Sequence, residues 1–213
     1  MAKTLAAIVD EAQTLYDISG SAVLTTPQWE VLANHGYRKL WATVTAVLKS
    51  FRATSQSFTL SGTTQTQALP AGFRETLKVI RDPGTNYAKI LTRFGDRTAM
   101  TSWERSYRVE GSNLVIEPLR NAAGSYQHLY IPDCPTLSVS VPVDDELDKF
   151  YETIVYYMVV TAMTREESET GGFGALLQEG YKDVKRWAAD QRNAEPDPVD
   201  DVRGTRRATG WSW

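Results

Sequence analysis

The sequence is poor in the residues and motifs on which most enzyme and metal sites depend. Its 213 residues include one cysteine, Cys134, and two histidines, His35 and His128. A single cysteine excludes an internal disulfide, and folding in the cytosol is then the default expectation. The chain has no phosphate-binding glycine loop and no GxGxxG, HExxH or GxSxG pattern. We therefore expect no cofactor and no enzymatic activity.

The chain also lacks an excess of positive charge. Twenty-three lysines and arginines face 26 aspartates and glutamates, giving a formal net charge of -3. Domains that bind phosphate backbones tightly are usually basic, so this balance argues against such a role. It leaves open a surface that lines a path for DNA, where strong adhesion would be a handicap.

Long hydrophobic runs are missing as well. A transmembrane helix needs about 20 apolar residues, and the most apolar stretch, within residues 144–169, is shorter and has polar flanks. Asp10 and Glu11 interrupt the N-terminal apolar segment, so we expect no signal peptide. The sequence thus predicts a protein without a membrane anchor.

The stretch 144–169 is nevertheless the centre of the predicted fold. Acidic residues at its start suit the positive end of a helix dipole, and its middle is apolar on almost every face. We predict one long helix here, surrounded by other helices. Hydrophobic spacing of three and four predicts those partners at residues 4–16, 26–52 and 173–192. Gly36, inside the second of them, predicts a close helix–helix crossing, since glycine otherwise costs a helix about 1 kcal/mol.

Between residues 55 and 143 the period changes to two and turn residues become frequent. We predict five to seven short strands in an antiparallel sheet or sandwich. One expected hairpin joins 57–60 to 66–69, and another joins 106–109 to 114–117, with Tyr107 and Ile116 on one face. Further strands are expected at 77–81, 87–91, 124–131 and 136–141, and a short helix at 96–104.

The predicted fold class is therefore α+β: a four-helix bundle with an inserted antiparallel β-sheet or sandwich and an extended C-terminal tail. The expected regions are 1–54 (N-terminal bundle helices), 55–143 (β-rich insertion), 144–192 (C-terminal bundle helices) and 193–213 (tail).

Few residues offer candidate chemistry. His128, Asp133 and Cys134 are conceivable metal ligands, but their spacing matches no ligand pattern. Asp144, Asp145, Glu146 and Asp148 could bind a divalent cation, although acids at the start of a helix explain them more simply. A hydrolase would have to use these acids, Glu117 or Asp133. We expect no metal site and no catalytic residue.

The last residues, 193–213, combine prolines with mixed charge and lack periodicity, so we do not expect them to fold alone. They contain Arg203, Arg206, Arg207, Trp211 and Trp213. Arginine and aromatic residues together suit nucleic acid, but the acids just upstream oppose that interpretation. A disordered end is the simple alternative. We favour a segment that docks its tryptophans into a partner protein, because tryptophan and arginine are frequent interface anchors.

The order of the segments resembles the head–tail adaptor (connector, head-completion) proteins of tailed bacteriophages and gene transfer agents. The resemblance is carried by WEVLANHGYRKLW (29–41), LPAGF (69–73), YRVEGSNLVIEP (107–118) and AGSYQHLYIP (123–132), followed by a helix with ETIVYY (152–157), a glycine break and a last helix. These are hydrophobic and turn patterns without a catalytic signature.

The resemblance implies a virion protein at the head–tail junction, made in the host cytoplasm. It implies a homo-oligomeric ring, typically a dodecamer, between the portal protein and a tail or nozzle protein. Double-stranded DNA would pass through the ring without tight binding. By position, Arg203, Arg206, Arg207, Trp211 and Trp213 would dock into the portal. The alternatives are a DNA-packaging accessory or DNA-binding protein and, less favoured, a metal-dependent hydrolase.

Overall fold

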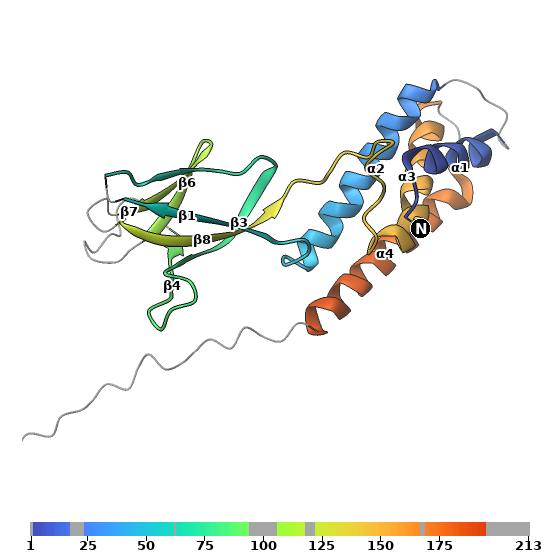
Figure 1. Cartoon of the computed structure of the whole chain (residues 1–213). Coiled ribbons are helices and arrows are strands. Elements are labelled where there is room, and N and C mark those ends of the chain that lie inside the picture. Colours follow the sequence, from blue (N-terminus) through green and yellow to red (C-terminus); the bar gives the residue numbers. More distant parts are fainter. Residues whose placement is uncertain are drawn as a thin grey trace, which may run out of the picture.

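The computed structural model describes residues 2–17, 24–61, 63–93, 106–117, 122–166 and 169–194. Within these ranges the chain forms four α-helices and two four-stranded sheets, which lie side by side as a helical lobe and a strand lobe (Figure 1). The helices are α1 (Leu5–Asp17), α2 (Thr26–Val47), α3 (Tyr151–Arg165) and α4 (Gly171–Ala194). The α+β prediction is thereby confirmed at the level of four helices and two sheets. None of the helices in the described ranges has the length and apolar composition to cross a membrane.

The first long helix, α2, begins where the sequence predicts. The backbone N–H of Thr25 donates to Oε1 of Gln28 over 2.8 Å, and Pro27 occupies the first turn, where no N–H is needed. Its buried stripe follows the three- and four-residue spacing: Trp29, Leu32, Ala33, Gly36, Tyr37, Leu40, Trp41 and Val44. This stripe packs against α3, which buries Ile154, Val155, Met158, Val159 and Ala162.

The predicted close crossing at Gly36 is confirmed. A Cβ atom built on Gly36 would lie 2.9 Å from Cδ1 of Tyr157 and 3.1 Å from Cγ2 of Ile154, both on α3. Real Cβ atoms do not approach carbon that closely. Gly36 is therefore required by the packing of α2 on α3.

Several helix boundaries differ from the prediction: α3 ends at Arg165 instead of near residue 169, and α4 begins at Gly171 instead of residue 173. Two further differences have a local cause. α2 ends at Val47 instead of near residue 52, because the chain turns and Arg52 adopts a left-handed φ of 52°, which a helix cannot continue. α3 begins at Tyr151 after a 3-10 turn (Asp148–Phe150), so residues 144–147 are not helical. There, Oδ1 of Asp144 accepts the N–H of Glu146 over 3.0 Å. Such a local side-chain bond competes with helix formation.

The strand lobe contains eight strands within the described residues, in two sheets of four: β1-β8-β3-β4 and β2-β7-β6-β5. Their bounds are β1 (Thr54–Leu60), β2 (Thr66–Ala68), β3 (Phe73–Arg81), β4 (Lys89–Ile90), β5 (Thr92–Arg93), β6 (Ser106–Glu110), β7 (Asn113–Glu117) and β8 (Gly124–Pro132). All pairings are antiparallel except β5 with β6, which is parallel, so the expectation of a purely antiparallel sheet is corrected. The lobe has its own core of Leu60, Val79, Leu91, Tyr107, Leu114, Ile116, Ala122 and Tyr126.

The predicted hairpin of residues 106–109 and 114–117 is confirmed as β6 and β7, with Tyr107 directly opposite Ile116. The predicted hairpin of 57–60 and 66–69 is wrong. β1 pairs with β8, where Phe58 faces Tyr126 and their rings stack 5.2 Å apart, whereas β2 pairs with β7 in the other sheet. A cross-strand aromatic pair contributes about 0.2–1 kcal/mol to a register, and this pair joins segments that are distant in sequence.

Two further expectations concern residues 94–141. The expected helix at 96–104 lies outside the described residues. The expected strand at 136–141 is wrong, since Ser138 and Val141 bond to each other across a tight turn (3.0 and 3.3 Å) and the segment joins neither sheet.

The Gly36 crossing gives a direct test of the packing of α2 on α3. We expect Gly36→Leu to lower the free energy of unfolding by about 1–3 kcal/mol, because the added side chain overpacks the crossing. Gly172→Leu is the matched control, since nothing lies within 4 Å of a Cβ at Gly172. It should change stability by no more than about 0.5 kcal/mol. Urea denaturation of both variants measures the difference, and equal effects would contradict the close crossing.

Candidate functional site

The two lobes are joined by residues 133–147, which follow β8 and run back along α2 to α3; we call this segment the strap. The N–H of Leu137 donates to Oδ1 of Asn34 over 2.7 Å. Further along the strap, the N–H of Asp144 donates to the hydroxyl of Tyr37 over 3.2 Å, and the N–H of Val143 donates to the carbonyl of Lys3 over 3.1 Å. The buried side chains of Leu137, Val143 and Leu147 belong to the helical core. The strap is therefore bound along its length, and Figure 1 shows it crossing α2.

A bidentate ion pair, which we call the clamp, closes the junction. Nε and Nη2 of Arg52 donate to the two carboxylate oxygens of Asp144 over 2.7 and 2.8 Å. Nη2 also lies 3.3 Å from Oε1 of Glu146. The hydrogen bond and charge of Asp144 raise the pKa of Arg52 further above its ordinary value. The clamp thus joins the chain where it leaves the helical lobe to the chain where it returns.

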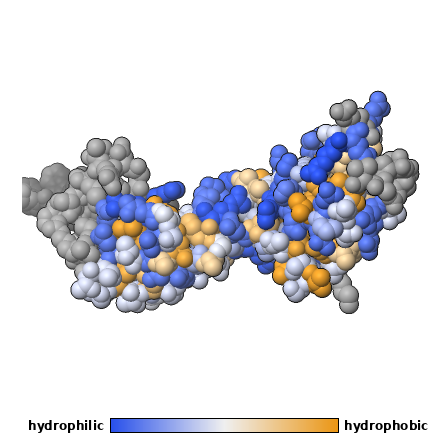
Figure 2. Space-filling view, turned by 90° about the horizontal axis from the view of Figure 1, so that it is seen from above, coloured by the Kyte–Doolittle hydropathy of each residue, from blue (hydrophilic) through white to orange (hydrophobic). Residues whose placement is uncertain are grey.

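One more polar contact spans the lobes. Nη1 of Arg74, on β3, donates to Oγ1 of Thr45, on α2, over 3.2 Å. Thr45 is buried and also donates to the carbonyl of Trp41. Figure 2 shows the two lobes as separate masses joined by a narrower waist. The strap, the clamp and Arg74 hold this waist together.

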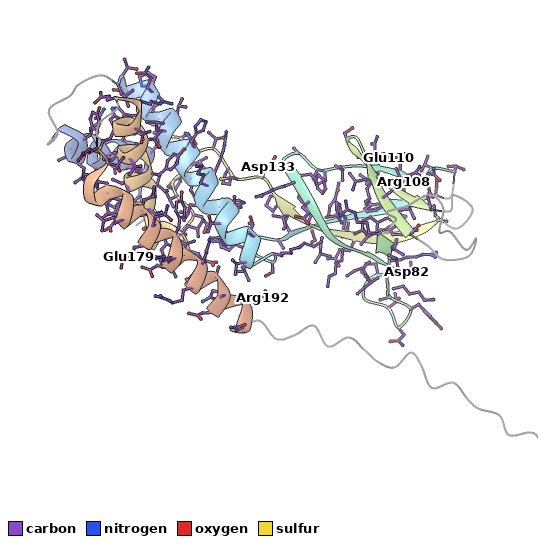
Figure 3. All side chains as sticks on the ribbon, turned by 180° about the vertical axis from the view of Figure 1, so that it is seen from behind. Asp82, Arg108, Glu110, Asp133, Glu179 and Arg192 are labelled. Carbon is purple, nitrogen blue, oxygen red and sulfur yellow. The ribbon has the colours of Figure 1, made fainter. Side chains whose placement is uncertain are left out.

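The residues considered for metal binding are not brought together. His128 is fully buried in the strand lobe, where its Nε2 lies 3.0 Å from Oγ1 of Thr76. Asp133 is exposed at the waist, as Figure 3 shows, and the Cys134 side chain packs against the helical core. Burial raises the pKa of the Cys134 thiol to about 12. Among the described residues, no three histidines, cysteines or carboxylates form a group suited to a metal ion.

Four of the six acids considered for hydrolysis are engaged in structural contacts: Asp144, Glu146, Asp148 and Glu117. Asp144 and Glu146 face Arg52, and Oδ1 of Asp148 accepts the backbone N–H of Lys3 over 2.6 Å. Glu117 lies 3.0 Å from Arg108, which also pairs with Glu110 on the same hairpin (Figure 3). The contacts of these four acids stabilise the fold.

The predicted docking residues Arg203, Arg206, Arg207, Trp211 and Trp213 lie outside the described residues, which end with α4 at Ala194.

Comparison with known proteins decides the class. The family model described as SU10 adaptor protein matches residues 3–201, nearly the whole chain. The chain belongs to the SU10 adaptor protein family. No curated protein matches it.

Membership makes this adaptor a bacteriophage structural protein that interacts with other virion proteins. The family is a structural one, which argues against an enzymatic role. The structural use of Asp144, Glu146, Asp148 and Glu117 agrees with that assignment.

Sequence reasoning missed the two features that organise the adaptor's waist. Residues 136–141 of the strap were expected to form a strand, and the acids from residue 144 onward were expected to begin a helix. Arg52 was expected only as the end of α2. One signal was present: Asp144 follows Pro142 by two residues, and an aspartate side chain can accept the N–H two residues further on, which forms an Asx-turn as readily as it begins a helix.

The clamp can be tested by removing its carboxylate. Asp144→Ala deletes the bidentate pair and the bond to the N–H of Glu146, so we expect a loss of about 1–2 kcal/mol in the free energy of unfolding. Glu146→Ala removes only the longer contact and should cost less than about 0.5 kcal/mol. Thermal denaturation measures both variants. Equal losses would show that the bidentate geometry contributes nothing.

The buried imidazole predicts a pH dependence. Burial lowers the pKa of His128 from 6.5 to about 4. Between these values the unfolded chain binds a proton that the folded chain does not, so stability present above pH 6.5 is lost as the pH falls. Between pH 7 and pH 5, we expect the free energy of unfolding of the wild-type adaptor to fall by about 2 kcal/mol more than that of His128→Gln.

The exposed His35 supplies the matched control, because His35→Gln leaves the buried ring in place. Denaturation midpoints at several pH values give the comparison. Identical pH profiles for wild type and His128→Gln would contradict a neutral buried imidazole.

Proposed function

We propose that this adaptor forms a homo-oligomeric ring, a dodecamer as in the resembling connector proteins, between the portal and a tail or nozzle protein. In this proposal the four helices act as a bundle that carries the ring contacts, and the strand lobe faces the next tail component. The ring extends the DNA channel and is a platform for tail attachment and for passage of the genome. The proposed units are residues 1–54 and 144–192 for the bundle, 55–143 for the insertion and 193–213 for the tail.

The single structural observation that carries the proposal is the clamped waist. A junction protein must hold one partner at a fixed position relative to another. Here two lobes with separate cores are joined by the strap, and the bidentate pair of Arg52 and Asp144 fixes the point of return. A rigid two-lobed subunit suits repeated placement around an axis, where one heterologous contact generates a closed ring.

Charge supports the DNA-channel role. Tight DNA binding depends on neutralising phosphates, and a chain with a net charge of -3 provides little of that. A DNA-binding function would show as salt-sensitive duplex binding. We expect no shift of duplex DNA in gels even at low salt.

The tail is proposed to dock into the portal through Arg203, Arg206, Arg207, Trp211 and Trp213, in the folding-on-binding mode of disordered segments. It begins after Arg192 near the free end of α4, as Figure 3 shows, so it can reach a neighbouring protein.

Deleting residues 204–213 tests the docking role. We expect the melting temperature to change by less than about 2 °C, because the two cores of the described chain are built from residues between Leu5 and Ala188, whereas binding to purified portal rings should be lost. The double variant Trp211→Ala/Trp213→Ala should reproduce the loss, since aromatic anchors dominate interfaces. Co-sedimentation with portal rings measures binding. An unfolded deletion variant, or unchanged portal binding, would refute the assignment.

A further inference from the structure

The helix α2 presents different surfaces on its two flanks. Asn34 and Tyr37 bond to the strap on one flank. Lys39, Thr43 and Ala46, spaced four and three residues apart, lie on the opposite flank of the helix and line a groove shared with α4. The strap and the groove are therefore displayed on opposite sides of the same rigid element.

The groove is lined partly by apolar and partly by basic side chains. It has a volume of ≈ 510 Å³ between Lys39, Ala42, Ala46 and Val47 of α2 and Tyr181 and Lys185 of α4. A second groove of ≈ 410 Å³ continues it, since Lys39, Gln178 and Tyr181 line both. Arg165 adds a third cation there, and no carboxylate from the described residues lines either groove.

The polar groups of this groove have few ionic or hydrogen-bond partners, although Nζ of Lys39 lies 4.9 Å from the centre of the Tyr157 ring. Within the described ranges, neither Lys39 nor Lys185 forms an ion pair, and the buried hydroxyl of Tyr181 has no hydrogen-bond partner. Burial raises the pKa of that hydroxyl to about 12, so it remains a donor. Buried donors are normally satisfied. The groove therefore suits an occupant with an apolar side chain and nearby carboxylates.

The strap offers that combination. Val139 is 96% exposed at the tip of the turn closed by Ser138 and Val141, and Val141 is 37% exposed. Val31 of α2 is 52% exposed and lines the same hollow as Val139, so the exposed apolar side chains here form a patch. An exposed apolar patch marks an interaction site more often than a single exposed valine does. The exposed acids Asp145 and Glu146 follow within seven residues of the tip.

We propose that the strap of one adaptor copy, led by Val139, inserts into the α2–α4 groove of the next copy. This inference rests on the proposed ring and names the surfaces that close it. The apolar tip fits the walls formed by Ala42, Ala46 and Val47. The exposed carboxylate of Asp145 complements the basic groove, whereas Glu146 already faces Arg52. Because tip and groove lie on opposite flanks of α2, each copy uses both, which is the heterologous arrangement that a ring requires.

The test uses one variant on each surface: Val139→Asp on the strap and Ala46→Asp in the groove, both at exposed positions. Tyr87→Asp is the matched control, since Tyr87 is 80% exposed on the strand lobe, away from both surfaces. Assembly of the full chain is measured by mass photometry, alone and on purified portal rings. We expect each of the first two variants to need at least a tenfold higher protein concentration than wild type to form rings. Tyr87→Asp should assemble at the wild-type concentration.

Mixing the two defective variants separates a heterologous contact from a general defect. A 1:1 mixture of Val139→Asp and Ala46→Asp retains one intact tip and one intact groove, on different molecules. We expect dimers to form in the mixture and in neither variant alone, without growth to rings.

Cross-linking gives an independent readout. In a Cys134→Ser background, Val139→Cys/Ala46→Cys should form a ladder of covalent oligomers under oxidation. Neither single cysteine should produce more than dimers.

The outcomes separate this inference from the proposed function. Rings that form equally well with Val139→Asp and Ala46→Asp would overturn the inference and leave the ring proposal standing. Wild-type protein that forms no ring, alone or on the portal, would overturn both. Duplex DNA or another protein that protects Lys185 from acetylation in the absence of assembly would also overturn the assignment of the groove to a second copy.

Discussion

The ion pair between Arg52 and Asp144 sets the architecture of this adaptor. The chain leaves the helical lobe at one of these residues and returns at the other. Closing so long an excursion costs conformational entropy, and the cost rises only slowly with its length. The bidentate pair, the bonds of Asn34 and Tyr37 to the strap, and the burial of Leu137 and Val143 offset that cost together. Without them, among the described residues, only the bond of Arg74 to Thr45 and two chain connections would link the strand lobe to the helices.

The need to hold the two lobes together explains the positions of the acidic residues that were considered as catalytic or metal-binding groups. The acids that look most like a catalytic or metal-binding set are the ones that hold the waist and the start of α3. Asp144 faces Arg52, and Asp148 binds the N-terminal backbone at Lys3. His128, the other candidate ligand, is buried as a neutral ring beside Thr76. In the described part of the chain, these side chains form contacts that stabilise the fold, which agrees with membership of a structural family.

Sequence reasoning recovered the features that depend on local pattern. The stripe of α2, the crossing at Gly36 and the hairpin of β6 and β7 follow from spacing of three, four and two residues. The sequence pattern did not predict contacts between residues that are far apart in the sequence. β1 prefers β8 because Phe58 meets Tyr126, and the strap leaves the sheets because Asn34, more than a hundred residues earlier, binds Leu137. The candidate docking surfaces were missed for the same reason, since an apolar tip on a strap is indistinguishable in sequence from a strand.

The adaptor is a subunit in which one bound strap holds the two lobes together. In our proposal, the exposed side of the strap contacts the next copy. Amide hydrogen exchange of the free protein tests the bound strap most directly. The account predicts that the amides of Leu137, Val143 and Asp144 exchange at least a hundredfold more slowly than in an unstructured chain, a protection of about 3 kcal/mol. Exchange of these three amides at the rate of an unstructured peptide, with the helices still protected, would contradict it.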